Sequence, residues 1–150
     1  MRAGEIAEQF PIVGVGTSAL VAARLIAQGR QPGIVVTGTD GSPVAVLPSS
    51  QVVRFMVPDY VQADPALARV LNEVSAATIA DRLRAATVRE LLPDPPMELA
   101  SVGPDATLIE AAAIMARLRS PLCAVLEGKQ VVGVITAARL LGLVCGDEPA

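Results

Sequence analysis

Residues 102–125, VGPDATLIEAAAIMARLRSPLCAV, predict a helix followed by a buried strand. Thr107 with Glu110 three residues later indicates a helix start, because each side chain can bond the other residue's backbone N–H. Pro121 then opens a short apolar run, LCAVL at 122–126, which is typical of a strand. The apolar positions after Thr107 recur at helical spacing and form one face: Ala111, Ile114, Met115 and Leu118.

The same pattern occurs earlier in the chain. Residues 13–36, VGVGTSALVAARLIAQGRQPGIVV, align with 102–125 at an offset of 89 residues. After a one-residue gap, VAVLPSSQVV at 44–53 aligns with VGVITAARLL at 132–141. Self-similarity at a fixed offset indicates a duplicated structural unit.

Each copy predicts the order strand, helix, strand, tight turn, strand, helix. In the first copy, Ala22, Leu25 and Ile26 form the apolar helix face, and Gly29 is expected to end that helix. The turns are TDGS and EGKQ, of which the first carries a strong hairpin signal. The other predicted elements are strands at 12–15, 34–36, 44–47, 99–102 and 131–135, and helices at 50–57 and 137–144.

A short amphipathic lead-in precedes each copy, at 3–11 and at 87–93, and the second opens with a capping box of Thr87 and Glu90. We therefore divide the chain into a first repeat with its lead-in (1–57), an insert (58–86) and a second repeat with its lead-in (87–150). One unit is too small to bury its own sheet. We expect an α+β fold in which two pseudo-symmetric repeats pack sheet to sheet.

The insert predicts two short helices. Asp64-Pro65 is a typical helix start, in which Asp caps and Pro takes the first turn. Apolar stripes follow on each helix, and the insert is expected either to pack against the pair or to dock a partner or a second copy. The stripes are Leu67, Val70, Leu71 and Val74, then Ile79 and Leu83.

Composition excludes several classes of function. Of 150 residues 52% are hydrophobic but only 2% aromatic, so the core must be aliphatic. The net charge is −3 without a basic stripe, which argues against nucleic-acid binding. No apolar run approaches the roughly 18 residues of a membrane span, and the first ten residues lack a signal peptide's apolar core. We expect a cytoplasmic protein that does not insert into membranes.

The chain has no histidine and two cysteines without metal-ligand spacing. The commonest general base and the commonest metal ligand are therefore missing, and we expect neither a catalytic nor a metal site. Cys123, inside an apolar run, is expected to be a small buried thiol. Cys145, near the end of the chain, is expected to be half-exposed.

With VRELL at 88–92, ATLIEAAAIM at 106–115 and GVIT at 133–136, the chain resembles tandem CBS domains, the Bateman module. The second copy carries the resemblance across 88–144, and the first copy follows at 3–57 through the repeat alignment. The resemblance implies a cleft between repeats that senses AMP, ADP, ATP or S-adenosylmethionine without any required cofactor. It also implies a homodimer and a regulated enzyme, channel or transporter.

The family's nucleotide signature ends in Gly, an apolar residue, any residue, Thr or Ser, two residues and Asp. Gly133 and Thr136 fit it, but Arg139 stands where the family's Asp accepts ribose hydroxyls. Arginine only donates hydrogen bonds, so Arg139 could instead hold a phosphate or carboxylate. Alternatively, it lies solvated on the surface, or it forms a salt bridge with a partner or within the chain. The first copy has Ala45, Pro48 and Gln51 at these positions.

Two functions remain after this reading of the sequence. The first is a non-catalytic regulatory module that senses an adenosyl nucleotide or another anion between the repeats and modulates a separately encoded enzyme or membrane transporter. The second is a ligand-free structural or dimerisation module. The candidate ligand residues are Thr136, Arg139, Gly133, Ser101, Asp105, Pro121 and Leu122 in the second copy, and Thr17, Ser18, Ser49 and Gln51 in the first.

Overall fold

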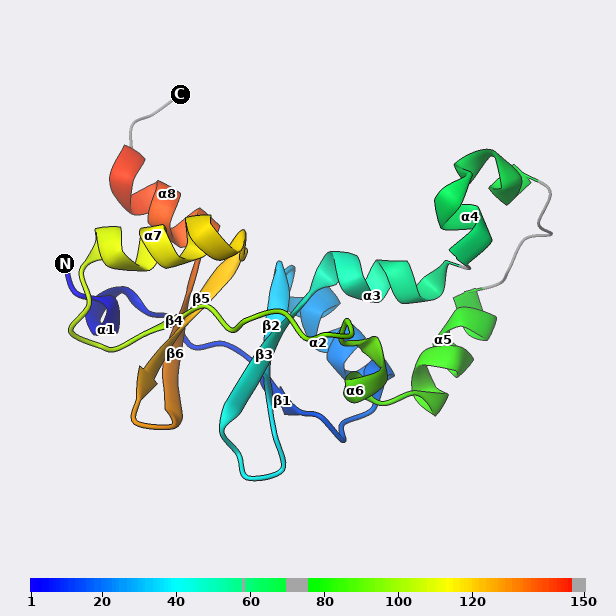
Figure 1. The fold of residues 1–150 in the computed structure, drawn as a ribbon, viewed down its shortest axis with the longest axis horizontal. Helices are drawn as coiled ribbons and strands as arrows, with labels where there is room; N and C mark the ends of the chain where they lie inside the picture. The colour runs from blue at the N-terminus through cyan, green and yellow to red at the C-terminus, as the bar shows by residue number, and fades with distance from the viewer. Residues whose placement is uncertain (58, 70–75, 147–150) are drawn as a thin grey trace.

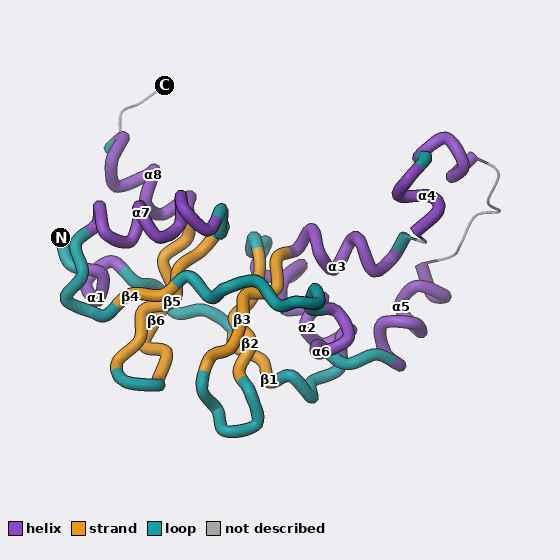
Figure 2. Tube along the Cα trace, viewed as in Figure 1, coloured by secondary structure: helices purple, strands orange, loops and turns teal. Residues whose placement is uncertain are grey.

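The computed structural model describes residues 1–57, 59–69 and 76–146. Figures 1 and 2 show two lobes side by side, each a sheet flanked by helices. Each sheet has three strands. In both sheets the middle strand pairs parallel with the first strand and antiparallel with the third. This identical topology confirms the duplicated unit. The strands are β1 (Ile12–Gly14), β2 (Gly33–Thr37) and β3 (Pro43–Pro48), then β4 (Ser101–Val102), β5 (Leu122–Glu127) and β6 (Gln130–Thr136).

Two helices flank each sheet: α2 (Ala19–Gly29) and α3 (Ser49–Met56) in the first lobe, α7 (Leu108–Leu118) and α8 (Ala137–Cys145) in the second. The expected capping box of Thr107 and Glu110 begins α7. None of the helices in the described ranges combines the length and the apolarity needed to cross a membrane.

The expected helix end at Gly29 is confirmed. Gly29 is the last residue of α2, and the left-handed residue that follows is Arg30, with φ 49°. Its N–H bonds the carbonyl of Ala27, and the N–H of Gln31 bonds that of Ile26. These two bonds satisfy the last carbonyls of the helix and hold a non-glycine residue in the left-handed region. Arg119 ends α7 in the same way, with φ 51°.

The two lead-in helices are exchanged between the lobes. Helix α1 (Ala3–Ile6) buries Ala3 and Ile6 in the core of the second lobe, whereas α6 (Val88–Leu91) buries Val88 and Leu91 in the first. Backbone bonds fix both positions, with 2.7 Å from the N of Ala3 to the O of Ala106 and 2.8 Å from the N of Val88 to the O of Thr17. Each repeat is therefore completed by the segment that precedes the other one.

The two sheets pack against each other, as the sequence predicts. Val35 and Val46 of the first sheet form one buried cluster with Leu122 and Val134 of the second. Burial of each such side chain stabilises the pair by about 1.5–3 kcal/mol. This apolar contact places the ends of β3 and β6, where α3 and α8 begin, on either side of the join between the lobes (Figure 1).

The insert forms α4 (Asp59–Ala63), a 3₁₀ turn η1 (Pro65–Arg69) and α5 (Ala76–Ala85). Leu83 on α5 is buried in the first lobe's core and Ile79 packs against it, which confirms that stripe. The other stripe fails at Leu67, which lies 37% exposed on the 3₁₀ turn. The remaining positions of that stripe, Val70, Leu71 and Val74, lie outside the described residues.

Candidate ligand site at the strand-to-helix junction

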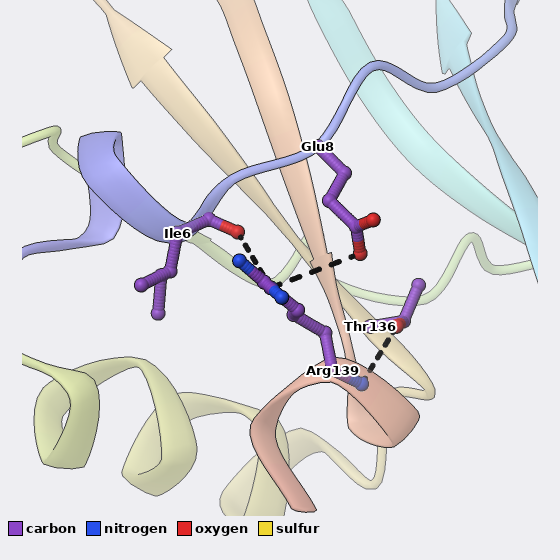
Figure 3. Close-up of polar contacts among 4 residues, drawn as sticks. All are labelled: Ile6, Glu8, Thr136 and Arg139. Atoms are coloured by element: carbon purple, nitrogen blue, oxygen red, sulfur yellow. Dashed lines mark hydrogen bonds and ion pairs between the residues drawn. The ribbon is translucent and has the colours of Figure 1, made fainter. Parts of the chain in front are cut away.

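Strand β6 passes directly into helix α8 at Thr136. The side chain of Thr136 caps this helix, because its Oγ1 accepts the backbone N–H of Arg139 at 3.1 Å (Figure 3). The hydroxyl proton remains available for donation to another acceptor. Thr136 is therefore both a helix cap and a potential donor to a ligand.

The side chain of Arg139 reaches the first lead-in. Its Nε donates to the carbonyl of Ile6 at 3.3 Å and lies 4.0 Å from Oε1 of Glu8 (Figure 3). The side chains of Arg139 and Glu8 are 39% and 57% exposed, and an ion pair this open contributes only about 0–1 kcal/mol. Of the roles considered for Arg139, the structure displays an intramolecular salt bridge, and a weak one.

Gly133 lies where the lead-in runs along strand β6. Glu8 exchanges two backbone hydrogen bonds with Val134, of 2.9 and 3.0 Å. The approach is so close that a Cβ on Gly133 would lie 2.7 Å from the Cβ of Ala7. Real Cβ atoms do not tolerate that distance, so the glycine admits the lead-in and thereby places Glu8 beside Arg139.

A cavity of about 360 Å³ lies between the repeats. Its walls combine the end of α2 with the starts of β5 and α8, so it exists only when both repeats are present. Its volume falls within the range of small-molecule sites. The first repeat supplies Arg30, Gln31 and Pro32, and the second supplies Pro121, Thr136, Ala137 and Ala138.

Of the residues predicted to bind a ligand, this cavity unites only Pro121 and Thr136. Leu122 follows Pro121 but is fully buried in the contact between the sheets. Gly133 and Arg139 serve the neighbouring contact with the lead-in. Arg139 lines a separate hollow of about 340 Å³ that shares Ala138 with the cavity.

The other candidates lie elsewhere and mainly hold backbone structure. Ser101 belongs to β4, and the backbone O of Asp105 accepts from Nη1 of Arg2 at 3.1 Å. The backbones of Thr17 and Ser18 bind the segment around α6. Ser49, the first residue of α3, donates its N–H to Pro32.

Gln51 lines a different cavity, of about 340 Å³, that the insert helps to form. There the guanidinium carbon of Arg82 lies 5.4 Å from the centroid of the Phe55 ring. The amide of Gln62 donates to the carbonyls of Arg54 and Val57 at the end of α3. These contacts join the insert to the first repeat.

Sequence reasoning missed Arg30 and Glu8. Arg30 lines the cavity as the left-handed residue that directly follows α2. The alignment of Pro32 with Pro121 was the only signal that both prolines lie at one site. Glu8 lies 131 residues from Arg139, and only the exchange of the lead-ins brings the two together.

Burial raises the pKa of the Cys123 thiol to about 11, so this cysteine is a neutral core residue. Cys145 is exposed, more so than expected. No group of three or more His, Cys, Asp or Glu side chains that could hold a metal gathers within the part of the chain that the structure describes. Thr136 and Arg139 supply the junction with a hydroxyl and a guanidinium that form hydrogen bonds.

Comparison with known proteins places this geometry among related folds. A family model, the CBS domain, matches residues 88–146. A crystal structure of a CBS domain-containing protein of unknown function from Kribbella flavida is 54% identical, with TM-score 0.86, and the match covers 97% of this chain and 99% of that one. No curated protein matches the sequence.

Two more distant structures share the fold alone. The CBS domain of a CBS domain-containing membrane protein from Sphaerobacter thermophilus is 18% identical, with TM-score 0.68, over 95% of this chain and 87% of that one. CBSX2, an Arabidopsis thaliana protein whose structure was solved in complex with AMP, is 15% identical, with TM-score 0.66, over 96% of both chains.

Proposed function

The chain belongs to the CBS-domain family, and from that membership we propose that it is a regulatory module whose paired repeats bind a small anionic ligand, of which an adenosyl nucleotide is the best candidate. The observation that carries this proposal is the cavity that both repeats line, with Arg30 from one repeat and Thr136 from the other. The module is non-catalytic and requires no cofactor in this proposal. In this proposal, binding of the ligand in the cavity is what changes the action of the module on the protein that it regulates.

The walls of the cavity suit a ligand with an apolar face and an anionic end. Pro32, Pro121 and Ala137 supply apolar surface, while the Arg30 guanidinium can bind a phosphate in a bidentate way. The hydroxyl of Thr136 can donate to the same anion. The complex of CBSX2 with AMP makes AMP the first ligand to test, although that protein resembles this one only in fold.

Arg139 sharpens the expected ligand preference. At the position where the resemblance implies an acceptor for ribose hydroxyls, this chain has only a donor. The ribose therefore contributes little to affinity and the phosphate contributes most. We expect AMP to bind more tightly than adenosine.

A thermal-shift titration tests the proposal directly. AMP, ADP, ATP, S-adenosylmethionine, adenosine and inorganic phosphate are each added to the full chain. A ligand at 100 times its Kd stabilises the folded state by about 2.7 kcal/mol, which a melting curve detects. The absence of any shift at millimolar ligand contradicts the proposal.

Arg30→Gly tests whether the cavity is the binding site. Glycine accepts the left-handed φ of 49°, so the backbone is preserved while the guanidinium is lost. Arg119→Gly is the matched control, since Arg119 has φ 51° at the aligned position but does not line the cavity. We expect weaker AMP binding only in Arg30→Gly, and equal effects of both variants would place the ligand elsewhere.

In this proposal the module works in the cytoplasm and acts on a separately encoded enzyme or membrane transporter. Support comes from the family membership. Crosslinking in cells, followed by mass spectrometry, tests whether such a partner exists. The experiment is done with and without the compound that gives the largest thermal shift. A partner whose recovery does not change with ligand would argue against regulation through occupancy.

A second candidate function, a ligand-free dimerisation module, is favoured by one observation. Between α7 and α8 runs an apolar groove of about 380 Å³, and its rim exposes Ile109 (71%), Leu141 (62%) and Val144 (68%). Contiguous apolar surface of this kind marks association sites. We expect a homodimer by light scattering and a monomer for Ile109→Glu with Leu141→Glu, and a wild-type monomer at high concentration contradicts this function.

A further inference from the structure

The Arg139 guanidinium has only loose partners. An optimal arginine–carboxylate pair engages two N–H groups at about 2.7–2.9 Å, but here one Nε faces one Glu8 oxygen at 4.0 Å. Within the described ranges, neither Nη atom of Arg139 has a hydrogen-bond partner. The cation is held in place but keeps most of its hydrogen-bonding capacity.

Space for a second anion lies beside this guanidinium. The hollow that Arg139 lines has a volume of about 340 Å³, and its other lining residues are Ala138, Gly142, Leu143 and Gly146. Its shared residue, Ala138, also borders the cavity between the repeats. The two hollows thus adjoin at Ala138, the residue before Arg139, and this is where we expect the phosphoryl group of a ligand to reach Arg139.

The carboxylate is fixed near the cation by its backbone and not by the ion pair. Glu8 exchanges two hydrogen bonds with Val134, and Ile6 is buried in the second lobe's core. Loss of the ion pair would leave these contacts intact. The side chain of Glu8 can thus swing away, as its 57% exposure allows, while the lead-in stays docked.

We propose that Glu8 is a built-in competitor for the anion site at Arg139, so that a phosphate-bearing ligand binds the guanidinium by displacing the Glu8 carboxylate. This inference rests on the proposed function, because it assumes that an anion binds between the repeats. Glu8 then sets the affinity that an anion needs in order to occupy the site at Arg139. Weakly held anions do not displace it, whereas a ligand with a doubly charged phosphate and further contacts does.

The test is isothermal titration of the full chain with AMP and, separately, with inorganic phosphate. Glu8→Gln removes the competing charge, and we expect AMP to bind up to about fivefold more tightly, as loss of a weak ion pair allows. Arg139→Gln should weaken binding, and Glu8→Gln should have no further effect in that background. Glu5→Gln is the control, since Glu5 lies in the same lead-in but contacts Arg2.

The outcomes separate the two proposals. If the wild type binds AMP but Glu8→Gln leaves the Kd unchanged, the competition is refuted and the proposed function stands. If Glu5→Gln tightens binding as much as Glu8→Gln, the effect is general electrostatics and the competition is again refuted. If no variant binds any of the probes, both proposals fail.

Discussion

The junctions that follow β3 and β6 occupy equivalent places in the two repeats but differ in chemistry. In the second repeat Thr136 caps α8, and Arg139 reaches the lead-in. In the first repeat the corresponding residues are Pro48, which caps α3 without a side-chain bond, and Gln51, which faces the insert. The duplication retained the apolar positions that build the core, while Thr136 and Arg139 of the second junction correspond to Pro48 and Gln51 in the first.

The two lead-ins also differ, in the hydrogen bonds that they can form with the sheet. Glu8 follows α1 and pairs with β6 through both its N–H and its carbonyl. Pro93, at the equivalent place after α6, has no N–H to donate. The first repeat receives its additional cover from α5, where Leu83 and Ile79 extend the core. One repeat is thus specialised for support by the insert and the other for the polar junction.

The largest change in stability is expected for variants that test the exchange of the lead-ins between the lobes. Ile6→Ala and Leu91→Ala each remove a large side chain that is 3% or less exposed, and each should cost about 2–5 kcal/mol in the free energy of unfolding. Urea denaturation measures the cost. Hydrogen exchange should rise in α7 and β5 for Ile6→Ala but in α2 and β2 for Leu91→Ala. The opposite assignment would show that each lead-in packs on its own repeat.

A smaller change in stability is expected for a variant that tests the close approach of the first lead-in to strand β6. Gly133→Ala places a Cβ 2.7 Å from that of Ala7, and we expect a loss of about 1–3 kcal/mol. The first repeat already has Ala45 at the aligned position, buried without this neighbour. Gly142→Ala is the control, because it has open space on α8 and should stabilise the helix by up to about 1 kcal/mol. Equal stability of both variants in urea denaturation would contradict the tight contact.

Helix and strand positions were predictable because each follows from local pattern. The capping box at Thr107, the apolar faces of α2 and α7 and the hairpin turns all act within a few residues. The candidate site was harder to predict, because Arg30 and Thr136 line one cavity, and Glu8 lies beside Arg139, only where the repeats pack together. The repeat alignment shows which positions are equivalent but not which lead-in crosses to which lobe.

A smaller effect compares the starts of the two equivalent helices α2 and α7. Thr107 accepts the N–H of Glu110 at 3.2 Å, whereas Ser18 makes no capping bond with its side chain. Thr107→Ala should therefore cost about 1 kcal/mol, and Ser18→Ala only a few tenths. Urea denaturation of the two variants decides this. An equal cost would mean that Ser18 caps α2 in solution.

The smallest effect concerns Cys123, whose aligned residue in the first repeat is Ile34. Burial raises the pKa of its thiol from 9.0 to about 11, so the folded state keeps the proton at a pH where the unfolded state loses it. The protein should then lose stability as the pH rises from about 9 towards 11, and Cys123→Val should lose less. At pH 8 a thiol reagent should label only Cys145 in the folded protein and both cysteines in urea. Rapid labelling of two thiols in the folded state would show that the second sheet opens far more readily than its burial implies, and that the two repeats differ in stability as well as in chemistry.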